Sequence, residues 1–318
     1  MTAIPSTRLV TIFGGSGFLG RHMVRALANE GWRIRVAVRR PNNALFLQPM
    51  GRVGQVQLVK ANVTNEESVR AALKGADAAI NLVAVLYQSG NQRFDSLHVE
   101  AAERIALLAS ELGVGRLLHV SALGIVGNAS HYARTKALGE ERVRARFAGA
   151  TIFRPSVVFG PEDDFFNKFA WLARVSPALP LIGGGGTKFQ PVFVGDVAQA
   201  VAKVLGDAST AGQTYELAGP ETLTLKQVME LVLRETRRHR VLLPIPFGLA
   251  RVQGLVLGLL PKPLLTLDQV RMLATDNVVS EGAATFRDLN IVPEAPGAII
   301  PSYLWRFRKH GEFEAATS

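Results

Sequence analysis

The hydrophobic and polar positions in the first half of the chain alternate between two periods. LVTIF at 9–13 is a short apolar run rich in branched residues, and the apolar positions of RHMVRALANEGW at 21–32 recur at helical spacing. The glycine-rich stretch GGSGFLG lies between them. The pattern therefore predicts a strand, a glycine turn and a helix.

This alternation continues to about residue 122. Further strands are expected at 33–41, 56–63, 77–85 and 116–122, and further helices at 65–76 and 98–114. Strands that alternate with helices are typical of a doubly wound parallel sheet. The predicted fold class is therefore α/β of the Rossmann type, with a smaller, mainly helical C-terminal lobe.

Two stretches of the C-terminal half could serve as contact surfaces. From Val241 to Leu267 the only charges are Arg251 and Lys262, and glycines and prolines interrupt the apolar run before it reaches the ~20 residues that cross a bilayer. This stretch is either a helical lobe that buries its own core or a surface for a membrane or partner. The basic cluster RETRRHR at 234–240 either forms a solvated helix end or binds an acidic partner, which would be anionic lipid or an acidic subunit.

Composition narrows the classes of partner. The 318 residues are 48% hydrophobic and 19% charged, which suits one or two globular domains, and the net charge of +10 favours acidic partners, phosphates or anionic lipid. Apart from WRFRKH near the end, aromatic-interleaved basic runs and RNA-binding signatures are missing, so no nucleic acid is expected. The chain has no cysteine and its six histidines lack metal-ligand spacing, so no metal is expected. The start MTAIPSTRLVTIFGG lacks a leader pattern, which suits a bacterial cytosolic chain or a trimmed one.

The glycines of GGSGFLG fit the spacing of a dinucleotide-binding turn. Gly15, Gly17 and Gly20 follow the Gly-x-Gly-x-x-Gly pattern, and Gly14 also allows Gly-x-x-Gly-x-x-Gly. Such a turn needs residues without a Cβ to bend, to admit a pyrophosphate and to pack helix on strand. The helix N-terminus then offers unpaired N–H groups to the phosphates. The alternative is a plain glycine-rich turn, but the place between strand and helix favours dinucleotide binding.

The end of the second predicted strand indicates which dinucleotide is expected. NAD-binding chains usually place Asp or Glu there for the ribose hydroxyls, whereas this chain has Arg39 and Arg40 and no acidic residue from Gly31 to Asn65. Guanidinium groups suit a 2′-phosphate, so the expected cofactor is NADPH rather than NADH. The alternative is a pair of solvated arginines in a loop.

The ends of the next two predicted strands lie at the same edge of the sheet. Asn62 and Val63 close the third strand and are expected near an adenine ring. Ala84 and Val85 close the fourth, where small apolar residues would let a nicotinamide half come near.

HYARTKALGE at 131–140 places Tyr132 four residues before Lys136 near the start of a predicted helix. At this spacing the two side chains lie on one helical face, so an ammonium group can sit near a phenol and stabilise its anion. A lone Tyr-x-x-x-Lys is common on ordinary surface helices, so the neighbouring motifs must decide whether this pair has a functional role.

HVSALG and YARTK together resemble the extended short-chain dehydrogenase/reductase superfamily, whose catalytic residues are a serine after the fifth strand and a Tyr-x-x-x-Lys pair. Ser121, Tyr132 and Lys136 match by position. The resemblance implies that the tyrosine is the acid/base for hydride transfer, that the lysine holds ribose and lowers the tyrosine pKa, and that the serine orients a substrate carbonyl. RPSVVFGP at 154–161 extends the resemblance and implies that Pro155 lies against the nicotinamide.

PLLTLDQVRMLATDNVVS at 263–280 narrows the resemblance to a branch of atypical members, the NADPH-binding accessory subunits of respiratory complex I (NADH:ubiquinone oxidoreductase). This branch implies a tightly held NADPH that serves structure rather than catalysis, and contacts with peripheral-arm subunits near the membrane and the quinone entrance. For a bacterial form, the expected location is the cytoplasmic face of the inner membrane, peripheral and without a transmembrane span. An anionic membrane surface is a further expected partner.

The predicted site and lobes follow from these motifs and the resemblance. The residues expected to line the cofactor site are Gly14, Gly15, Ser16, Gly17, Phe18, Leu19, Gly20, Arg39, Arg40, Asn62, Val63, Ala84, Val85, Tyr132, Lys136 and Pro155, with Ser121, Tyr132 and Lys136 at the catalytic positions. The nucleotide part is expected at 1–159 with a return segment at 188–210, the small lobe at 160–187 and 211–303, and a tail at 304–318.

Two functions remain open at this point. The first is an accessory subunit that holds NADPH without turnover. The second is an active NADP-dependent reductase for an apolar carbonyl such as a quinone, sterol or lipid aldehyde, because Ser121, Tyr132 and Lys136 are all present. A regulatory NADPH sensor has no sequence feature of its own.

Overall fold

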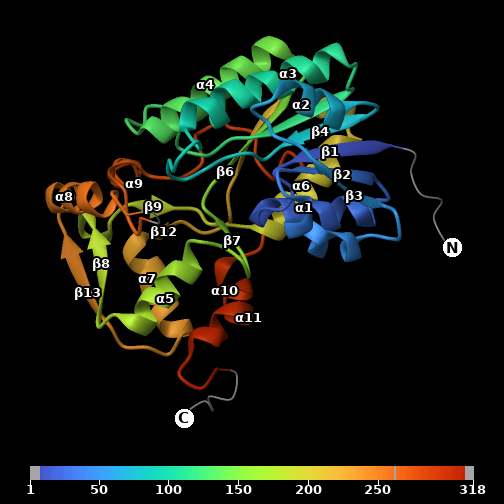
Figure 1. Ribbon diagram of the computed structural model, residues 1–318. Helices are drawn as coiled ribbons and strands as arrows, with labels where there is room; N and C mark the ends of the chain where they lie inside the picture. Colours follow the sequence, from blue (N-terminus) through green and yellow to red (C-terminus); the bar gives the residue numbers. More distant parts are fainter. Residues whose placement is uncertain (1–7, 261–262, 312–318) are drawn as a thin grey trace.

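The computed structural model describes residues 8–260 and 263–311, and its larger lobe is built on a seven-stranded parallel sheet (Figure 1). The strand order is β11-β6-β5-β4-β1-β2-β3. The strands are β1 Leu9–Phe13, β2 Arg33–Val38, β3 Val56–Lys60, β4 Ala78–Asn81, β5 Arg116–Val120, β6 Thr151–Pro155 and β11 Thr214–Leu217. The predicted fold class is confirmed, and the sheet includes β11, a strand that the predicted return segment does not contain.

Helices cover both faces of this sheet. One face carries α1 Phe18–Asn29, α6 Val194–Gly206 and the 3-10 helix η1 Pro41–Met50 (Figure 1). The other carries α2 Glu66–Leu73, α3 Ala101–Glu111 and α4 His131–Arg146. The π-helix η2 Asp95–Glu100 directly precedes α3, and the 3-10 helix η4 Ala208–Thr210 follows α6. Strands β1 and β4 are buried along their whole length. Apart from Thr11 and Asn81, whose side chains are hydrogen-bonded, their residues are apolar, because a parallel sheet with both faces covered has no solvated side.

The order of the strands fixes where a ligand can bind. From β1 the chain moves outward to β2 and β3, and from β4 it moves the other way to β5, β6 and β11. In open α/β sheets, ligands bind at the carboxyl ends of the strands where this direction reverses. The reversal lies between β1 and β4, where the Leu82 N–H donates to the Phe13 carbonyl at 3.0 Å.

The third and fourth strands are shorter than predicted. Asn62 and Val63 lie in a turn beyond β3, and Ala84 and Val85 lie in a loop beyond β4. The Asn62 N–H donates to the hydroxyl of Ser68 at 2.8 Å, so it is not available to a neighbouring strand. The Val85 N–H likewise leaves the sheet and donates to a histidine ring at 3.1 Å.

The smaller lobe is mainly helical and is formed from segments on both sides of α6. Its elements are α5 Phe166–Val175, β8 Ala178–Ile182, η3 Gly183–Gly185, α7 Leu225–Glu235, β13 Val241–Ile245, α8 Phe247–Leu257, α9 Leu267–Met272, α10 Pro296–Ile299, α11 Pro301–Leu304 and η5 Trp305–Phe307. Strand β13 pairs in parallel with β8. Two short pairs join this lobe to the sheet, β7 Val158–Phe159 with β10 Val192–Phe193 and β9 Lys188–Phe189 with β12 Leu223–Thr224.

The predicted tail begins inside this lobe. Leu304 is fully buried with aromatic and aliphatic residues of α5 and α7, and Arg306 donates to the Pro161 carbonyl at 2.7 Å. The rest of the predicted tail, 312–318, lies outside the described residues, as does the segment 1–7 to which the leader expectation applies. Over 8–260 and 263–311, no helix has the length and apolar character needed to cross a membrane.

Candidate functional site

The glycine turn after β1 has the shape that its spacing predicts. Gly14 has φ +82°, a conformation that L side chains rarely adopt. A Cβ on Gly20 would lie 2.5 Å from backbone atoms of Gly15, so helix α1 can approach the turn closely only without a side chain there. The turn therefore brings the start of α1 directly under the carboxyl end of β1.

The N-terminus of α1 keeps its backbone donors available. Its N-cap is Gly17, and within residues 8–260 and 263–311 no side-chain hydrogen bond caps the helix. Phe18 packs toward Gly160, and Leu19 packs on the sheet core, so these side chains support the turn from inside. Ser16 is half-buried within the turn. Unpaired N–H groups at a helix start, above a turn without Cβ atoms, suit a pyrophosphate.

Arg39 faces a cavity at the carboxyl ends of β2 and β3. The cavity has a volume of about 340 Å³ and is lined by Arg39, Lys60, Ala61, Asn62 and Ser68. Arg40 follows Arg39 but precedes η1, and its carbonyl accepts the Asn43 N–H at 3.1 Å. The sequence pointed to two arginines, whereas the cavity lining pairs Arg39 with Lys60, which ends β3 next to Val38 in the parallel register.

Asn62 lines this cavity, and Val63 follows it in a local turn. The Asn62 side chain accepts the Thr64 N–H at 3.2 Å, and the Val63 carbonyl accepts a hydrogen bond from Arg104 at 2.9 Å. The Val63 side chain packs partly on the core beside α2. Both residues thus have structural contacts of their own, and of the two only Asn62 belongs to the cavity lining. That both lie near an adenine ring stays a prediction.

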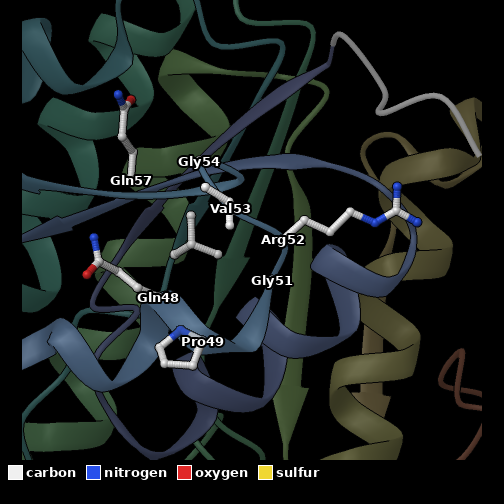
Figure 2. Close-up of a pocket in the computed structure, with 8 residues that line it drawn as sticks. Gln48, Pro49, Gly51, Arg52, Val53, Gly54 and Gln57 are labelled. Carbon is white, nitrogen blue, oxygen red and sulfur yellow. The ribbon is translucent and has the colours of Figure 1, made fainter.

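A second hollow lies apart from these residues. Figure 2 shows this hollow of about 440 Å³ beside η1 and β3, lined by Gln48, Pro49, Gly51, Arg52, Val53, Gly54, Val56 and Gln57. Arg52 is its one charged lining residue, and the lining contains no carboxylate, histidine or nucleophile. We therefore assign no chemistry to it.

Tyr132 and Lys136 lie together on the buried face of α4. Tyr132 is 6% exposed and Lys136 1%, and the Lys136 ammonium donates to the Val120 carbonyl at 2.8 Å. Burial lowers the pKa of Lys136 to about 8, although nearby Glu140 opposes this shift. Burial raises the pKa of Tyr132 to about 12. Desolvation of the phenolate is the cause of this upward shift, and the lowering of the tyrosine pKa by the lysine stays an implication of the family resemblance.

Ser121 and His119 each bring a polar atom without a partner to this region. Ser121 is 5% exposed, and neither its Oγ nor the Nε2 of His119 has a hydrogen-bond partner among the described residues. The other ring nitrogen of His119 accepts from Asn81 at 3.1 Å. An unsatisfied buried polar atom costs about 1–3 kcal/mol, so these two atoms suit a bound polar group.

His98 connects the loop after β4 to α4. Its ring stacks on Phe94 at 5.1 Å and meets the Tyr132 ring edge-on at 5.3 Å. Its Nε2 accepts the Val85 N–H, and its Nδ1 lies 3.1 Å from the Thr135 hydroxyl. Burial lowers the pKa of His98 to about 3, so the ring is neutral. Helical spacing alone did not single out this histidine.

Pro155 ends β6 and Val85 lies in the loop beyond β4, and these two strands flank β5. The Pro155 carbonyl accepts the Leu123 N–H at 2.9 Å, which ties the end of β6 to the loop after Ser121. Val85 is half-buried, and Ala84 beside it is exposed. The predicted nicotinamide residues thus surround one region at the carboxyl edge of β4, β5 and β6.

Comparisons with known proteins agree with this arrangement. Residues 10–218 match the NAD dependent epimerase/dehydratase family. The Arabidopsis thaliana protein named NADH dehydrogenase [ubiquinone] 1 alpha subcomplex subunit 9, mitochondrial, is 38% identical over 95% of this chain and 79% of its own length. A Caulobacter vibrioides protein named ceramide reductase is 34% identical, over 55% of this chain and 54% of its own.

A solved structure supports the fold independently. The NADPH-dependent quinone oxidoreductase QOR2 from Escherichia coli, complexed with NADPH, superposes with a TM-score of 0.74 over 93% of this chain and 99% of its own, at 19% identity. At this identity the likeness shows the fold alone. The glycine turn, the buried Tyr-x-x-x-Lys pair and the match over most of the sheet lead to one conclusion: this chain belongs to the NAD dependent epimerase/dehydratase family.

Proposed function

We propose that this chain is an accessory subunit of respiratory complex I that holds NADPH without turnover. The observation that carries the proposal is how far the similarity extends. The family match ends at residue 218, but the similarity to the alpha subcomplex subunit 9 protein covers 95% of the chain and so includes the C-terminal lobe. A C-terminal lobe shared with a complex I subunit favours contacts with other subunits of that complex.

The pKa values of Tyr132 and Lys136 favour a site that binds NADPH without catalysing its oxidation. A general acid or base works best with a pKa near the operating pH, and burial raises the pKa of Tyr132 to about 12. With its pKa at about 8, Lys136 stays mostly protonated at neutral pH and can donate to a ribose hydroxyl. Ser121, Tyr132 and Lys136 are thus proposed to bind the nicotinamide half, and a bound cofactor would stabilise the fold by mass action.

NADPH is proposed over NADH because of the charges around the adenosine end. The cavity beside β2 and β3 has Arg39 and Lys60 in its lining and no carboxylate. A 2′-phosphate there would meet two cations, whereas the two ribose hydroxyls of NADH would find no acidic acceptor.

A membrane surface is proposed as a partner because α8 exposes its large apolar side chains. Its buried positions are the small Ala250 and Gly254, and a Cβ on Gly254 would lie 2.8 Å from the Leu267 backbone nitrogen of α9. The exposed apolar residues of this lobe, which we call the α8 patch, are Val241, Leu243, Leu249, Val252, Leu255, Val256, Leu259, Leu260 and Leu264. No acidic residue occurs from 236 to 267, so the patch suits an anionic lipid surface.

The decisive experiment isolates the tagged protein from membranes and measures what accompanies it. We expect complex I subunits by mass spectrometry, NADPH released on denaturation, and no oxidation of NADPH by a panel of quinones, sterol ketones and aldehydes. Recovery without complex I subunits would contradict the proposal. Fractionation of the same cells tests the expected location at the cytoplasmic face of a bacterial inner membrane.

The second candidate function is an NADP-dependent reductase for an apolar carbonyl. It is favoured by the presence of Ser121, Tyr132 and Lys136 at the catalytic positions of the family. It is also favoured by the Oγ of Ser121, which has no hydrogen-bond partner in the part of the chain that the structure describes. NADPH oxidation by any member of the carbonyl panel, lost in Tyr132→Phe, would establish this function instead.

A further inference from the structure

The segment 264–280 crosses the carboxyl edge of the sheet between the small lobe and α4. It contains α9, which begins at a capping box formed by Thr266 and Gln269. The Thr187 hydroxyl donates to the Leu273 carbonyl at 2.6 Å, which fixes the middle of the segment to β9. This segment contains the Leu-Thr-x-Asp-Gln-Val and Asp-Asn-Val-Val runs, whose role the proposed function leaves unexplained.

Asp268 of this segment caps the helix that carries Tyr132. Its two carboxylate oxygens accept the backbone N–H groups of His131 at 2.7 Å and Tyr132 at 2.9 Å. The Ser130 hydroxyl accepts the Ala133 N–H at 3.1 Å, so the first turn of α4 has both a local cap and a distant one. A carboxylate at a helix N-terminus is stabilised by the helix dipole and by charge-assisted hydrogen bonds.

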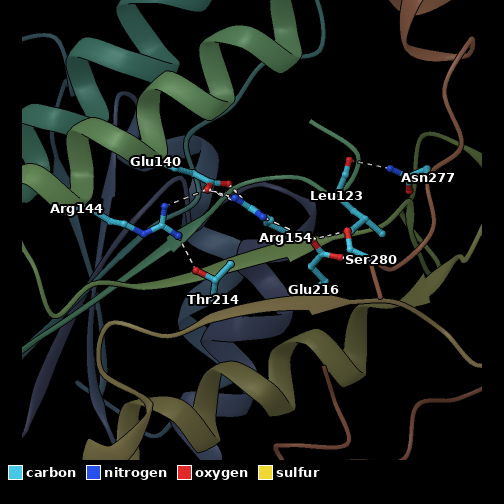
Figure 3. Close-up of polar contacts among 8 residues, drawn as sticks. All are labelled: Leu123, Glu140, Arg144, Arg154, Thr214, Glu216, Asn277 and Ser280. Atoms are coloured by element: carbon cyan, nitrogen blue, oxygen red, sulfur yellow. Dashed lines mark hydrogen bonds and ion pairs between the residues drawn. The ribbon is translucent and has the colours of Figure 1, made fainter. Parts of the chain in front are cut away.

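Asn277 joins the same segment to the loops after β5 and β6. Its side-chain amide donates to the Leu123 carbonyl at 2.8 Å (Figure 3). Its side-chain oxygen accepts the Ser156 hydroxyl at 2.6 Å. Leu123 follows Ser121 by two residues, and Ser156 follows Pro155 directly. One side chain therefore ties together the two loops that bear predicted nicotinamide contacts.

A buried ion network holds the end of the segment to the middle of α4. The Ser280 N–H donates to the Glu216 carboxylate at 2.7 Å, and Arg154 lies between Glu216 at 3.5 Å and Glu140 of α4 at 2.7 Å (Figure 3). Arg144 lies 3.5 Å from Glu140 on the other side. Burial of Glu140 and Glu216 makes this network costly to break, because removing one partner leaves an unpaired buried charge.

We propose that Asp268 and Asn277 are positioning residues for the nicotinamide end of the cofactor site. Asp268 acts through the backbone of Tyr132, and Asn277 acts through the loops that carry Ser121 and Pro155. The inference rests on the proposed function, since it concerns the same NADPH site, and it assigns the C-terminal lobe a direct role in shaping that site. The adenosine end at Arg39 lies beyond the point between β1 and β4 where the strand order reverses. Among the described residues, none of the side-chain hydrogen bonds of Asp268 and Asn277 reaches Arg39.

The test compares two ligands that differ at the nicotinamide end. NADPH reports on the whole site, whereas 2′,5′-ADP reports on the adenosine end alone. We expect Asp268→Asn to raise the Kd for NADPH about tenfold, as expected for the loss of roughly one charge-assisted hydrogen bond, and to leave the Kd for 2′,5′-ADP within about twofold. Asp268→Glu keeps the carboxylate and should recover part of the affinity.

Asp276 provides a matched control on the same segment. Like Asp268, Asp276 accepts a backbone N–H with its carboxylate, here that of Lys188 at 2.8 Å, which lies in β9 and not in α4. Asp276→Asn should therefore leave the Kd for NADPH within about twofold. Hydrogen exchange at the His131 and Tyr132 amides should accelerate in Asp268→Asn and not in Asp276→Asn.

Each outcome supports or overturns the inference. If Asp268→Asn weakens both ligands equally, or weakens NADPH no more than Asp276→Asn does, Asp268 has only a structural role and the inference is wrong. Asn277→Ser is titrated in parallel, so that the inference stays testable if Asp268→Asn does not fold; unchanged NADPH affinity there would overturn the role of Asn277. If the unmodified protein binds neither ligand, the proposed function itself fails, an outcome that is distinct from a failure of the variants.

Discussion

Replacing Arg39 with serine removes one of the two cations in the lining of the cavity beside β2 and β3. A hydrogen bond to a charged group contributes about 1.5–3 kcal/mol when it is well sheltered. Arg39 is exposed, so solvent screening places its contribution at the low end, about 1.5 kcal/mol, which corresponds to roughly a tenfold change in Kd. We therefore expect Arg39→Ser to weaken NADPH binding about tenfold and to leave NADH binding within about twofold.

The assay is a fluorescence titration of each nicotinamide dinucleotide into the purified protein. Lys60→Ser should also weaken NADPH selectively, because Lys60 lines the same cavity. Arg40→Ser is the matched control, since Arg40 carries the same charge but is not in that lining. Equal losses for NADPH and NADH in Arg39→Ser, or a larger selective loss in Arg40→Ser, would refute the assignment of the 2′-phosphate to this cavity.

Three further predictions test the turn, the buried histidine and the exposed patch. Gly20→Ala should lower the free energy of unfolding by about 1–3 kcal/mol in urea titrations, because the new Cβ would lie 2.5 Å from the Gly15 backbone. Gly248→Ala is the control and should leave this free energy unchanged, because no atom of the described residues lies within 4 Å of its new Cβ. The pKa of His98 is lowered from 6.5 to about 3 in the folded protein, so the unfolded chain binds the proton first as pH falls. The free energy of unfolding therefore decreases as pH drops below 6.5. Between pH 6.5 and pH 5, the unmodified protein should lose about 2 kcal/mol more of this free energy than His98→Gln does. An equal loss in both proteins would show that this ring does not titrate as described. Leu255→Glu in the α8 patch should reduce co-sedimentation with anionic vesicles several-fold. Val53→Glu, at an exposed apolar position outside the patch, should have no effect. Equal binding by both variants would show that the patch is not a lipid surface.

The site combines features of an enzyme with those of a binding pocket. The family residues Ser121, Tyr132 and Lys136 are all present and buried at one edge of the sheet. Their surroundings, however, oppose charge on Tyr132, and the Lys136 ammonium is engaged by the Val120 carbonyl. A bound dinucleotide stabilises the folded state, and this stabilisation is a sufficient physical reason to keep the whole pocket. The pull-down and the carbonyl panel separate this explanation from turnover.

Local features of the site could be predicted from the sequence because they depend on neighbouring residues. The glycine turn and α1 form one strand-turn-helix unit, and β1 was predicted at its observed bounds, Leu9–Phe13. The Tyr132–Lys136 pair needs only helical periodicity to share a face, and α4 spans both residues. The charges along the second predicted strand likewise led the sequence analysis to Arg39 and Arg40 in place of an acidic residue. All of these inferences rest on contacts within a few residues along the chain.

The sequence by itself determined the doubly wound sheet and the glycine turn, since periodicity and turn chemistry are local properties. Only the tertiary structure decided that α8 turns its small residues inward and leaves large apolar side chains exposed, because which face a helix buries depends on its neighbour, here α9. It also decided that Asp268 caps a helix at Tyr132, 136 residues away along the chain, and that Lys60 joins Arg39. Burial, which sets the direction of the Tyr132 pKa, likewise exists only once the chain has packed.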